Sequence, residues 1–440
     1  MTHRYFPHTP EDIEAMLATC GVKSLDDLYS DVPEQLLLGR EYNLPEEMSE
    51  KEVRDFFKAL ASGNKALTCF AGAGYYDHYT PAVVPAILSR SEFLTAYTPY
   101  QPEISQGTLQ YIFEYQSMMA SLTGLDVSNA SMYDGATATA EAMIMMVAAA
   151  RKRNRVLVSS TLLPQVMDVV KTYASYHGIT LDIIPEIDGV TSIDDLKSML
   201  AADVAGVILP TPNKYGILED FSGVADAIHT NKSLLAMNCV ASALGVIKTP
   251  GEWGADIAAG DAQSLGMPLN FGGPYLGFLC CKKALIRKLP GRIVGATVDE
   301  AGQRSFVLTL QAREQHIRRE KATSNICSNQ GLMSLFVSVY LSLLGPAGLK
   351  EVNDVSCKGA RYLAAKLVST GKVKLTFGDR PFLNEFAVTT EFDTATLMER
   401  CLECGILPGV ALDDHTMLIA VTEMRTRAEI DRLVEIVTTL

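Results

Sequence analysis

The chain has 440 residues, of which 48% are hydrophobic and 20% are charged, and its formal net charge is −13. This composition is typical of a folded globular protein, and the length allows a large core or more than one domain. The negative charge argues against nucleic-acid binding and against an anionic membrane surface, because both require clustered cations. An odd count of 9 cysteines argues against a closed disulfide framework.

The sequence carries no recognisable targeting segment. Residues 1–7 contain neither an apolar signal core nor the arginine- and serine-rich pattern of a presequence. No apolar run is expected to span a bilayer, and the stretch from Ala142 to Ala150 is too short to do so. Together with the cysteine usage, these patterns predict a reduced, cytoplasmic protein.

Residues 1–65 are predicted to form an all-helical arm. Thr9 places a capping hydroxyl before Pro10, which suits the first helical position. Ser49 and Glu52 form a capping box that opens a second helix. That helix carries an apolar stripe made of Val53, Phe56, Phe57 and Leu60. Such a stripe must be buried, either against the same chain or against a partner.

The segment from Ala71 to Pro81 combines glycines with aromatic residues. Gly72-x-Gly74 lacks the third glycine and the preceding strand of a dinucleotide-binding fingerprint, so a Rossmann site is not expected. Its tyrosines are more typical of loop anchors than of ligand contacts. A lone histidine such as His78 is likewise more often structural than a ligand or a base.

Two further polar segments are candidates for a binding site. The first, from Tyr97 to Gly107, has too many prolines for a helix, and it offers the side chains of Tyr97, Tyr100, Gln101, Glu103 and Gln106. A loop around a pocket and a plain surface loop explain it equally well. The second contains Ser131 and Tyr133 and opens directly into a buried helix, whose free amides would suit an anion such as phosphate. An ordinary cap by Asp134 is the alternative.

From Arg155 to about Gly260, short apolar strands alternate with helical segments. The expected strands are 156–159, 181–184, 204–209, 234–237 and 255–258, and the expected helices are 163–177, 193–200 and 221–231. This alternation predicts a mainly parallel sheet with helices on both faces. Ligands of such sheets bind at the carboxyl ends of strands, where residues 210–213, Asn238 and residues 260–264 fall. A glycine-rich, hairpin-like run then leads to Cys281.

The region after the strand 304–310 is polar and net basic within an acidic chain. Residues 311–321 are expected to form a solvated helix with many ion pairs, followed by a hydroxyl- and amide-rich turn at 322–329. A long buried helix comes next, and residues 346–440 are predicted to form a compact α/β domain. Cys401 and Cys404 have no second pair and no nearby histidine, so buried thiols explain them better than zinc.

A helical arm (1–65), a large α/β domain (66–345) and a small C-terminal α/β domain (346–440) together resemble the aspartate-aminotransferase-like fold, fold type I, of pyridoxal phosphate enzymes. Four motifs resemble more specifically the glycine decarboxylase (P-protein) family of the glycine cleavage system. They are residues 97–107, 131–137, 260–266 and 311–326. The resemblance covers essentially the whole chain, and at this length it points to the separate α subunit, subunit 1, which corresponds to the amino-terminal half of the single-chain form.

The resemblance implies a reaction and its partners. Glycine combines with pyridoxal phosphate and loses its carboxylate as carbon dioxide, and the remaining aminomethyl group passes to the lipoyl disulfide of a carrier, the H-protein. The cofactor acts as the electron sink, while the protein supplies position and electrostatics. The α subunit of this oxidoreductase is expected to be active only with a β subunit, in an α2β2 tetramer.

Two positions indicate that this chain does not hold the cofactor itself. Pyridoxal phosphate needs a lysine amine that forms an imine with it. In the β subunit that lysine follows a Gly-Ala-Asp-Ile strand at a fixed offset, and the same offset from Gly254 reaches Ser264, whose hydroxyl cannot form an imine. One strand earlier, the carboxylate expected to pair with the pyridinium nitrogen is replaced by Asn238. The resemblance therefore implies a vestigial pocket, no catalytic residue in this chain alone, and a cofactor bound to the β subunit.

A role at the partner's site is then expected, because active sites of this fold lie at subunit interfaces. The resemblance places Thr323, Ser324 and Asn325 in the turn that contacts the neighbour's cofactor phosphate. It places on the glycine or lipoyl side the residues His78, Tyr97, Tyr100, Gln101, Glu103, Gln106, Ser131 and Tyr133. Two other hypotheses stay open: a non-catalytic scaffold for the β subunit, and a self-sufficient decarboxylase that uses another lysine, such as Lys248, Lys282, Lys283 or Lys321.

Overall fold

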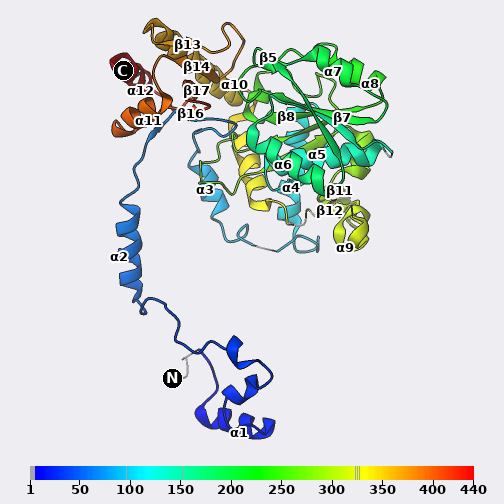
Figure 1. Ribbon diagram of the computed structural model, residues 1–440. Coiled ribbons are helices and arrows are strands. Elements are labelled where there is room, and N and C mark those ends of the chain that lie inside the picture. The colour runs from blue at the N-terminus through cyan, green and yellow to red at the C-terminus, as the bar shows by residue number, and fades with distance from the viewer. Residues whose placement is uncertain (1–4, 96, 151, 323, 325, 327) are drawn as a thin grey trace. The chain divides into compact units, whose positions relative to one another are not determined.

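The computed structural model describes residues 5–440 except 96, 151, 323, 325 and 327, and Figure 1 gives its elements. Contacts within the chain divide it into two units, one ending at Lys65 and the other comprising Ala66–Leu440. Because residues 323 and 325 are not described, the predictions for Thr323 and Asn325 lie outside the described residues.

The first unit is helical, as predicted. Its elements are α1 (Pro10–Cys20), η1 (Asp26–Tyr29), η2 (Glu34–Leu36) and α2 (Glu50–Ala61). Both predicted caps are present, because the side chains of Thr9 and Ser49 each accept a backbone N–H three residues on. The four elements contain no buried residue among them. The described part of this unit therefore supplies no core of its own for the apolar stripe of α2.

The second unit is built on a seven-stranded sheet of order β2-β10-β9-β8-β7-β3-β4. Its strands are β2 (Val127–Ser128), β3 (Arg155–Ser159), β4 (Thr180–Ile184), β7 (Val204–Thr211), β8 (Leu234–Val240), β9 (Ile257–Asp261) and β10 (Gly277–Cys281). All neighbours are parallel except β10, which is antiparallel to β9 and to β2. The mainly parallel sheet and the hairpin-like run after β9 are thus confirmed.

Helices cover both faces of this sheet (Figure 1). They are α4 (Gln106–Thr123), α5 (Gly135–Ala150), α6 (Pro164–Tyr176), α7 (Ile193–Met199), α8 (Val224–Thr230) and α10 (Gly331–Ser369). Consecutive strand residues serve opposite faces, as the pleat requires. Val156 and Val158 pack with α5 and α6, whereas Leu157 and Val207 pack with α4, α8 and the first part of α10.

The helix α10 is two helices joined at a kink. Gly345 has a φ of 59° and Pro346 follows it, so the helical hydrogen-bond pattern is interrupted there. By length and composition alone α10 is apolar enough to cross a membrane, which differs from the expectation that no apolar run is long enough. The part before the kink, residues 331–344, is shorter than the about 20 residues of a membrane span. Its Phe336 and Tyr340 are buried in the protein core.

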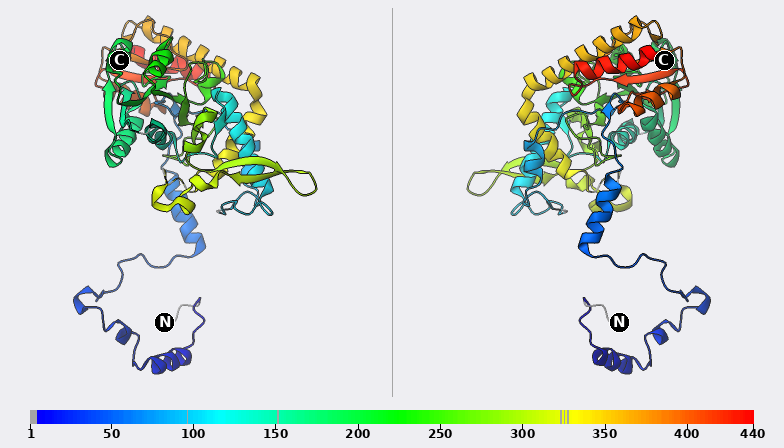
Figure 2. Two further views of the ribbon diagram at one scale, coloured as in Figure 1. Left: turned by 90° about the vertical axis from the view of Figure 1, so that its right-hand side faces the viewer. Right: turned by 90° about the vertical axis from the view of Figure 1, so that its left-hand side faces the viewer.

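Shorter elements surround the sheet. They are β1 (Thr68–Cys69), α3 (Val83–Leu88), β5 (Glu186–Ile187), β6 (Val190–Thr191), η3 (Ser242–Gly245), η4 (Lys283–Lys288), β11 (Ile293–Val298), β12 (Arg304–Thr309), η5 (Gln311–Arg313), α9 (Gln315–Arg318) and η6 (Arg319–Lys321). Figure 2 shows the β11–β12 hairpin extending beside α4. The prediction of one solvated helix over residues 311–321 is wrong. Three separate turns form instead, and Arg319, with a φ of 52°, breaks the helical path.

The C-terminal elements form a second, smaller layer. They are β13 (Val373–Leu375), β14 (Glu385–Thr390), α11 (Thr394–Glu403), β15 (Ile406–Leu407), β16 (Val410–Ala411), β17 (Thr416–Ala420) and α12 (Arg427–Thr439). Their sheet, of order β13-β14-β17-β16, packs with α11, α12 and the later part of α10 in a separate apolar cluster. We propose, on the basis of this second core and the kink at Gly345, that Ala66–Leu440 contains two domains, 66–345 and 346–440.

Replacing Gly277 with alanine should destabilise the protein. A Cβ atom at Gly277 would lie 2.2 Å from the backbone oxygen of Asp134, and overpacking of this kind costs about 1–3 kcal/mol. Gly107 is the control, because a Cβ atom there meets nothing within 4 Å. Urea unfolding followed by circular dichroism should show a lower free energy of unfolding for Gly277→Ala only. Equal stability of the two variants would contradict this packing.

Candidate functional site

The carboxyl end of β9 meets the start of α5. The backbone N–H of Gly135 donates to Asp261 Oδ2 at 3.0 Å, and the N–H of Thr137 donates to Asp134 Oδ1 at 2.7 Å. Both carboxylates therefore lie at the amino end of a helix, where its partial positive charge favours them. A Cβ atom at Gly135 would lie 2.5 Å from the nitrogen of Asp261. Only glycine allows this close approach.

A cavity of about 430 Å³ opens beside this junction. It is lined by Tyr75, Tyr133, Asp134, Gly272, Pro274, Tyr275 and Gln330. The rings of Tyr75 and Tyr275 are stacked, with centroids 5.0 Å apart. Burial, followed by the charges of Asp261 and Asp134, raises the pKa of Tyr75. The cavity has the size of a small-molecule site, and the described residues that line it include no lysine.

Asp261 is a titratable group at this junction. Burial raises the pKa of its carboxyl to about 7, although hydrogen bonds from the backbone N–H groups of Gly135 and Gln263 act in the opposite direction. The Gln263 N–H lies 2.8 Å from Asp261 Oδ1. The protein therefore satisfies both oxygens of this carboxyl with its own backbone.

The two positions predicted to be vestigial are buried and hydrogen-bonded within the protein. Ser264 Oγ accepts the backbone N–H of Ser242 at 3.0 Å. The side-chain amide of Asn238 donates to Thr139 Oγ1 at 2.8 Å. Neither residue is among those that line the 430 Å³ cavity.

The loop before α4 carries five of the predicted residues. Gln106 fixes the loop to β12: its amide donates to Phe306 O at 2.9 Å, and its oxygen accepts the Phe306 N–H at 2.9 Å. The hydroxyl of Tyr97 donates to Gln101 Oε1 at 3.1 Å, and both side chains, like that of Glu103, are exposed. Gln106 thus has a structural contact, while the other three side chains remain accessible.

The remaining residue of this loop, Tyr100, is exposed and contacts a polar network that extends into the interior. The guanidinium of Arg292, which is 4% exposed, lies 5.4 Å from the Tyr100 ring centroid and donates to Asn329 Oδ1 at 3.3 Å. The amide of Asn329 in turn donates to Ser131 Oγ at 2.7 Å. Ser131 has a φ of 146°, which is rare outside glycine, so its hydrogen bonds hold a strained backbone. The structure connects Tyr100 and Ser131 through Arg292 and Asn329.

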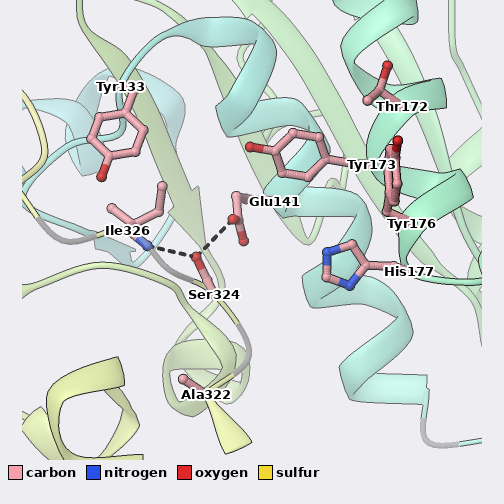
Figure 3. A pocket seen from close by; sticks show the side chains of 9 residues that line it. All are labelled: Tyr133, Glu141, Thr172, Tyr173, Tyr176, His177, Ala322, Ser324 and Ile326. Atoms are coloured by element: carbon pink, nitrogen blue, oxygen red, sulfur yellow. Dashed lines mark hydrogen bonds between the residues drawn. The ribbon is translucent and has the colours of Figure 1, made fainter. Parts of the chain in front are cut away.

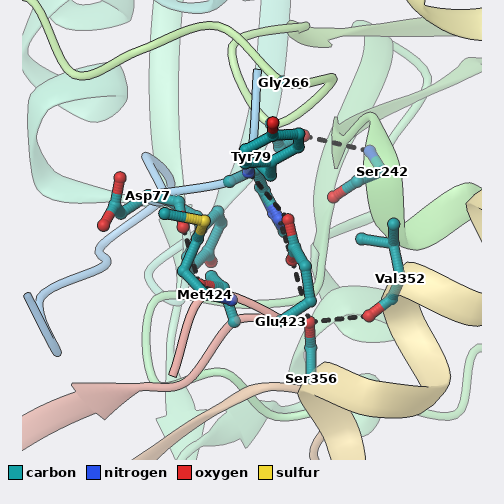
Figure 4. Close-up of polar contacts among 12 residues, drawn as sticks. Asp77, Tyr79, Ser242, Gly266, Val352, Ser356, Glu423 and Met424 are labelled. Carbon is teal, nitrogen blue, oxygen red and sulfur yellow. Dashed lines mark hydrogen bonds and ion pairs between the residues drawn. The ribbon is translucent and has the colours of Figure 1, made fainter. Parts of the chain in front are cut away.

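His78 lies in a different place. Its Nδ1 is 2.7 Å from Glu423 Oε2, and Glu423 also accepts the backbone N–H of Tyr79 at 2.8 Å (Figure 4). Burial alone would raise the pKa of Glu423, but the hydrogen bond and charge of His78 keep it below its ordinary value. This pair connects the segment before α3 with the C-terminal region. The geometry favours the structural explanation of His78, and its place at the site stays a prediction.

A second cavity, of about 370 Å³, also contains Tyr133 (Figure 3). Ser324, the described member of the predicted phosphate-contacting turn, lines this cavity and donates its hydroxyl to Glu141 Oε1 at 2.8 Å. Glu141 is 5% exposed. Burial raises the pKa of its carboxyl to about 7, against the opposing effect of the hydrogen bond from Ser324.

Comparisons with known proteins cover the whole chain. Residues 3–437 match the family model of the glycine cleavage system P-protein. A relative from Moorella thermoacetica, described as probable glycine dehydrogenase (decarboxylating) subunit 1, is 50% identical over 436 residues, which are 98% of each chain. The chain belongs to the glycine cleavage system P-protein family.

Solved structures support the same family and fold. A crystal structure of glycine decarboxylase (P-protein) of the glycine cleavage system, in inhibitor-bound form, has a TM-score of 0.89 and 42% identity, and the match covers 99% of this chain and 100% of that one. An alanine–glyoxylate aminotransferase from Nostoc sp., 15% identical over 92% of this chain and 98% of that one, has a TM-score of 0.62, a likeness of fold alone. The predicted family and the aspartate-aminotransferase-like fold of pyridoxal phosphate enzymes are confirmed.

Within this P-protein fold, the buried charged residues that had no predicted role include Glu141, Arg292 and Glu385. Each makes its contacts with residues far away in the sequence. In the sequence, the only signal for such a buried residue is a charged side chain within an otherwise apolar helix or strand. This signal does not identify the residue's hydrogen-bond partner. Among the described residues no group of His, Cys, Asp and Glu could hold a metal ion.

Glu385, at the start of β14, holds the segment that carries Tyr75 into the first cavity. Its carboxylate accepts the backbone N–H of Ala73 at 2.6 Å and the hydroxyl of Tyr76 at 3.0 Å. Gln263 holds the same segment, because its side chain exchanges two hydrogen bonds of 2.8 Å with the backbone of Tyr76. The C-terminal region and the turn after β9 thus jointly position one wall of the cavity.

Replacing Glu385 with glutamine should change how stability depends on pH. Burial raises the pKa of Glu385 to about 7, whereas a glutamate in an unfolded chain titrates near about 4.3. The folded state therefore binds the proton more tightly, so this group lowers stability as pH rises from about 4.5 through 7. Glutamine is neutral throughout and keeps an acceptor for Ala73.

Urea unfolding at pH 5 and pH 8 checks this expectation. The wild-type chain should lose about 1–3 kcal/mol more over this interval than Glu385→Gln. The exposed Glu391, replaced by glutamine, is the control and should behave as wild type. Identical pH dependence of Glu385→Gln and wild type would show that the carboxyl titrates normally.

Proposed function

We propose that this chain is the α subunit, subunit 1, of a glycine decarboxylase. It acts with a β subunit to decarboxylate glycine and to transfer the aminomethyl group to the lipoyl group of the H-protein. The observation that carries this proposal is the end-to-end similarity to relatives named as subunit 1. The 42% identity to a glycine decarboxylase over the full chain supports it.

The residues present do not suit pyridoxal phosphate on this chain. The expected amine is replaced by the hydroxyl of Ser264, and the expected carboxylate is replaced by the amide of Asn238. The start of α5, where a phosphate would need free amides, already donates the N–H of Gly135 to Asp261. The cofactor therefore belongs to the β subunit, and the α subunit has no catalytic residue acting alone.

The α subunit completes the partner's site with the turn Thr323, Ser324 and Asn325, which contacts the cofactor phosphate across the interface. Two observations support this role. Ser324 donates a hydrogen bond to Glu141. Ser324 also lines a small depression whose charged lining residues are four cations and one carboxylate: Arg287, Lys288, Arg313, Arg318 and Glu314. Positive charge around this turn favours an anion such as phosphate.

The glycine or lipoyl side is formed by the loop before α4 and the residues that face it. Tyr97, Tyr100, Gln101 and Glu103 offer accessible polar side chains, while Gln106 keeps the loop in place. Ser131, Tyr133 and His78 complete the proposed lining. The assembly is an α2β2 tetramer in the cytoplasm.

Borohydride trapping tests where the cofactor is held. Reduction fixes pyridoxal phosphate to the lysine that carries it, and mass spectrometry then locates the labelled peptide. In the αβ complex the label should appear on the β subunit and be absent from this chain. A labelled lysine on this chain would favour the self-sufficient decarboxylase instead.

Two of the four alternative lysines already have other contacts. Lys248 Nζ lies 3.8 Å from the ring centroid of Trp253. Lys282 Nζ lies 2.8 Å from Asp256 Oδ1. Neither they nor Lys283 and Lys321 line the two cavities described above. These contacts weigh against the self-sufficient decarboxylase.

Replacing Tyr100 with alanine tests whether the α subunit contributes to turnover or is only a scaffold for the β subunit. Loss of the ring beside Arg292 should lower the turnover of glycine–bicarbonate exchange in the αβ complex by about ten-fold, equivalent to about 1.4 kcal/mol. Tyr100→Phe keeps the ring and should lose less. Sedimentation should show normal assembly of both variants. Unchanged turnover with normal assembly would favour the scaffold hypothesis.

A further inference from the structure

The 370 Å³ cavity is distinct from the one beside the β9–β10 hairpin. It lies between α5, α6 and the residues Ala322, Ser324 and Ile326, and it shares only Tyr133 with the first cavity (Figure 3). Its volume is within the range of small-ligand sites, about 300–1,000 Å³. The function proposed above uses its lining residues Ser324 and Tyr133, but it gives Glu141 and the space between α5 and α6 no ligand.

Glu141 supplies the carboxyl group that lines the cavity. The residue is 5% exposed, and one of its oxygens, Oε1, accepts the Ser324 hydroxyl at 2.8 Å. Its other oxygen, Oε2, has no hydrogen bond within the part of the chain that the structure describes. A buried carboxylate is costly unless a cation or hydrogen bonds compensate it. The described lining residues include no lysine or arginine, so among them only His177 could offset a negative charge on Glu141.

Three tyrosines contribute to the walls of the cavity. Tyr133 and Tyr173 line it together with Thr172 and His177, and Tyr176 lines it while remaining 87% exposed. The charge of Glu141 contributes to the raised pKa of Tyr173, after the larger effect of burial, so the two side chains are close. Aromatic faces attract cations electrostatically. A carboxylate with one free oxygen and tyrosine walls is a typical environment for a small cation.

We propose that this cavity binds a primary ammonium group, with Glu141 as its counter-ion and the tyrosine rings as its walls. An ammonium suits the site better than a guanidinium does, because the two parallel donors of a guanidinium require both carboxylate oxygens, and Ser324 already takes one. The ammonium group belongs either to a small free amine or to a lysine side chain of the β subunit. The second source rests on the function proposed above, whereas the first does not.

Titration with n-propylammonium chloride tests the site directly. Binding to the full chain and to the αβ complex is followed by saturation-transfer NMR, with n-propanol as the neutral analogue. Glu141→Gln keeps an oxygen for Ser324 and loses the charge, so its affinity for n-propylammonium should fall at least about ten-fold. Glu141→Asp keeps the charge and should retain part of the affinity. Asp168→Asn removes an exposed carboxylate from α6 and should have no effect.

The complex distinguishes the two sources. With a free amine as the ligand, n-propylammonium binds the αβ complex as well as the isolated chain. With a β-subunit lysine as the ligand, the complex excludes n-propylammonium, and Glu141→Gln weakens assembly about ten-fold.

Three results would overturn the proposal. They are equal binding of n-propanol, undiminished binding to a folded Glu141→Gln variant, and no binding to the chain together with unchanged assembly. Because the isolated-chain titration needs no β subunit, its failure is separable from a failure of the proposed function.

Discussion

The hydrogen bond between the Gly135 N–H and the Asp261 carboxylate is the interaction on which the functional edge of the sheet depends. It joins the end of β9 to the start of α5 at 3.0 Å and requires a glycine at position 135. The antiparallel pairing of β9 with β10 reaches the same junction, where Gly277 lies opposite Asp261. The 430 Å³ cavity opens beside this junction, and Tyr133 lines both this cavity and the 370 Å³ cavity. A carboxylate, and not a bound anion, satisfies the helix amide there.

The fold was largely predictable because its signals are local. Strand–helix alternation predicts a mainly parallel sheet, and capping residues such as Ser49 mark helix starts within three or four residues of sequence. The basic segment 311–321 shows where local reasoning fails. Its charges fit a solvated helix, but the backbone reverses at Arg319, and Arg313 donates to backbone carbonyls of Leu289 and Gly291 instead of solvent.

The candidate site was less predictable, because its contacts are distant in sequence. Glu385 binds Ala73 across 312 residues, and Ser324 binds Glu141 across 183. No pattern within a helix or strand indicates such pairs. The motif resemblance located Ser131 and Tyr100 without indicating that Arg292 connects them. It located Ser264 and Asn238 without indicating that Ser264 is hydrogen-bonded to Ser242 and Asn238 to Thr139.

The kinked helix α10 has a consequence for how the second unit loses its structure. Phe336, before Gly345, belongs to the apolar cluster under the main sheet, whereas Leu363, beyond it, belongs to the cluster of the C-terminal sheet. The chain passes through Gly345 directly from one cluster into the other, so unfolding of one cluster frees an end of the helix that packs in the other. We expect the two layers to melt together, without a separate thermal transition for either.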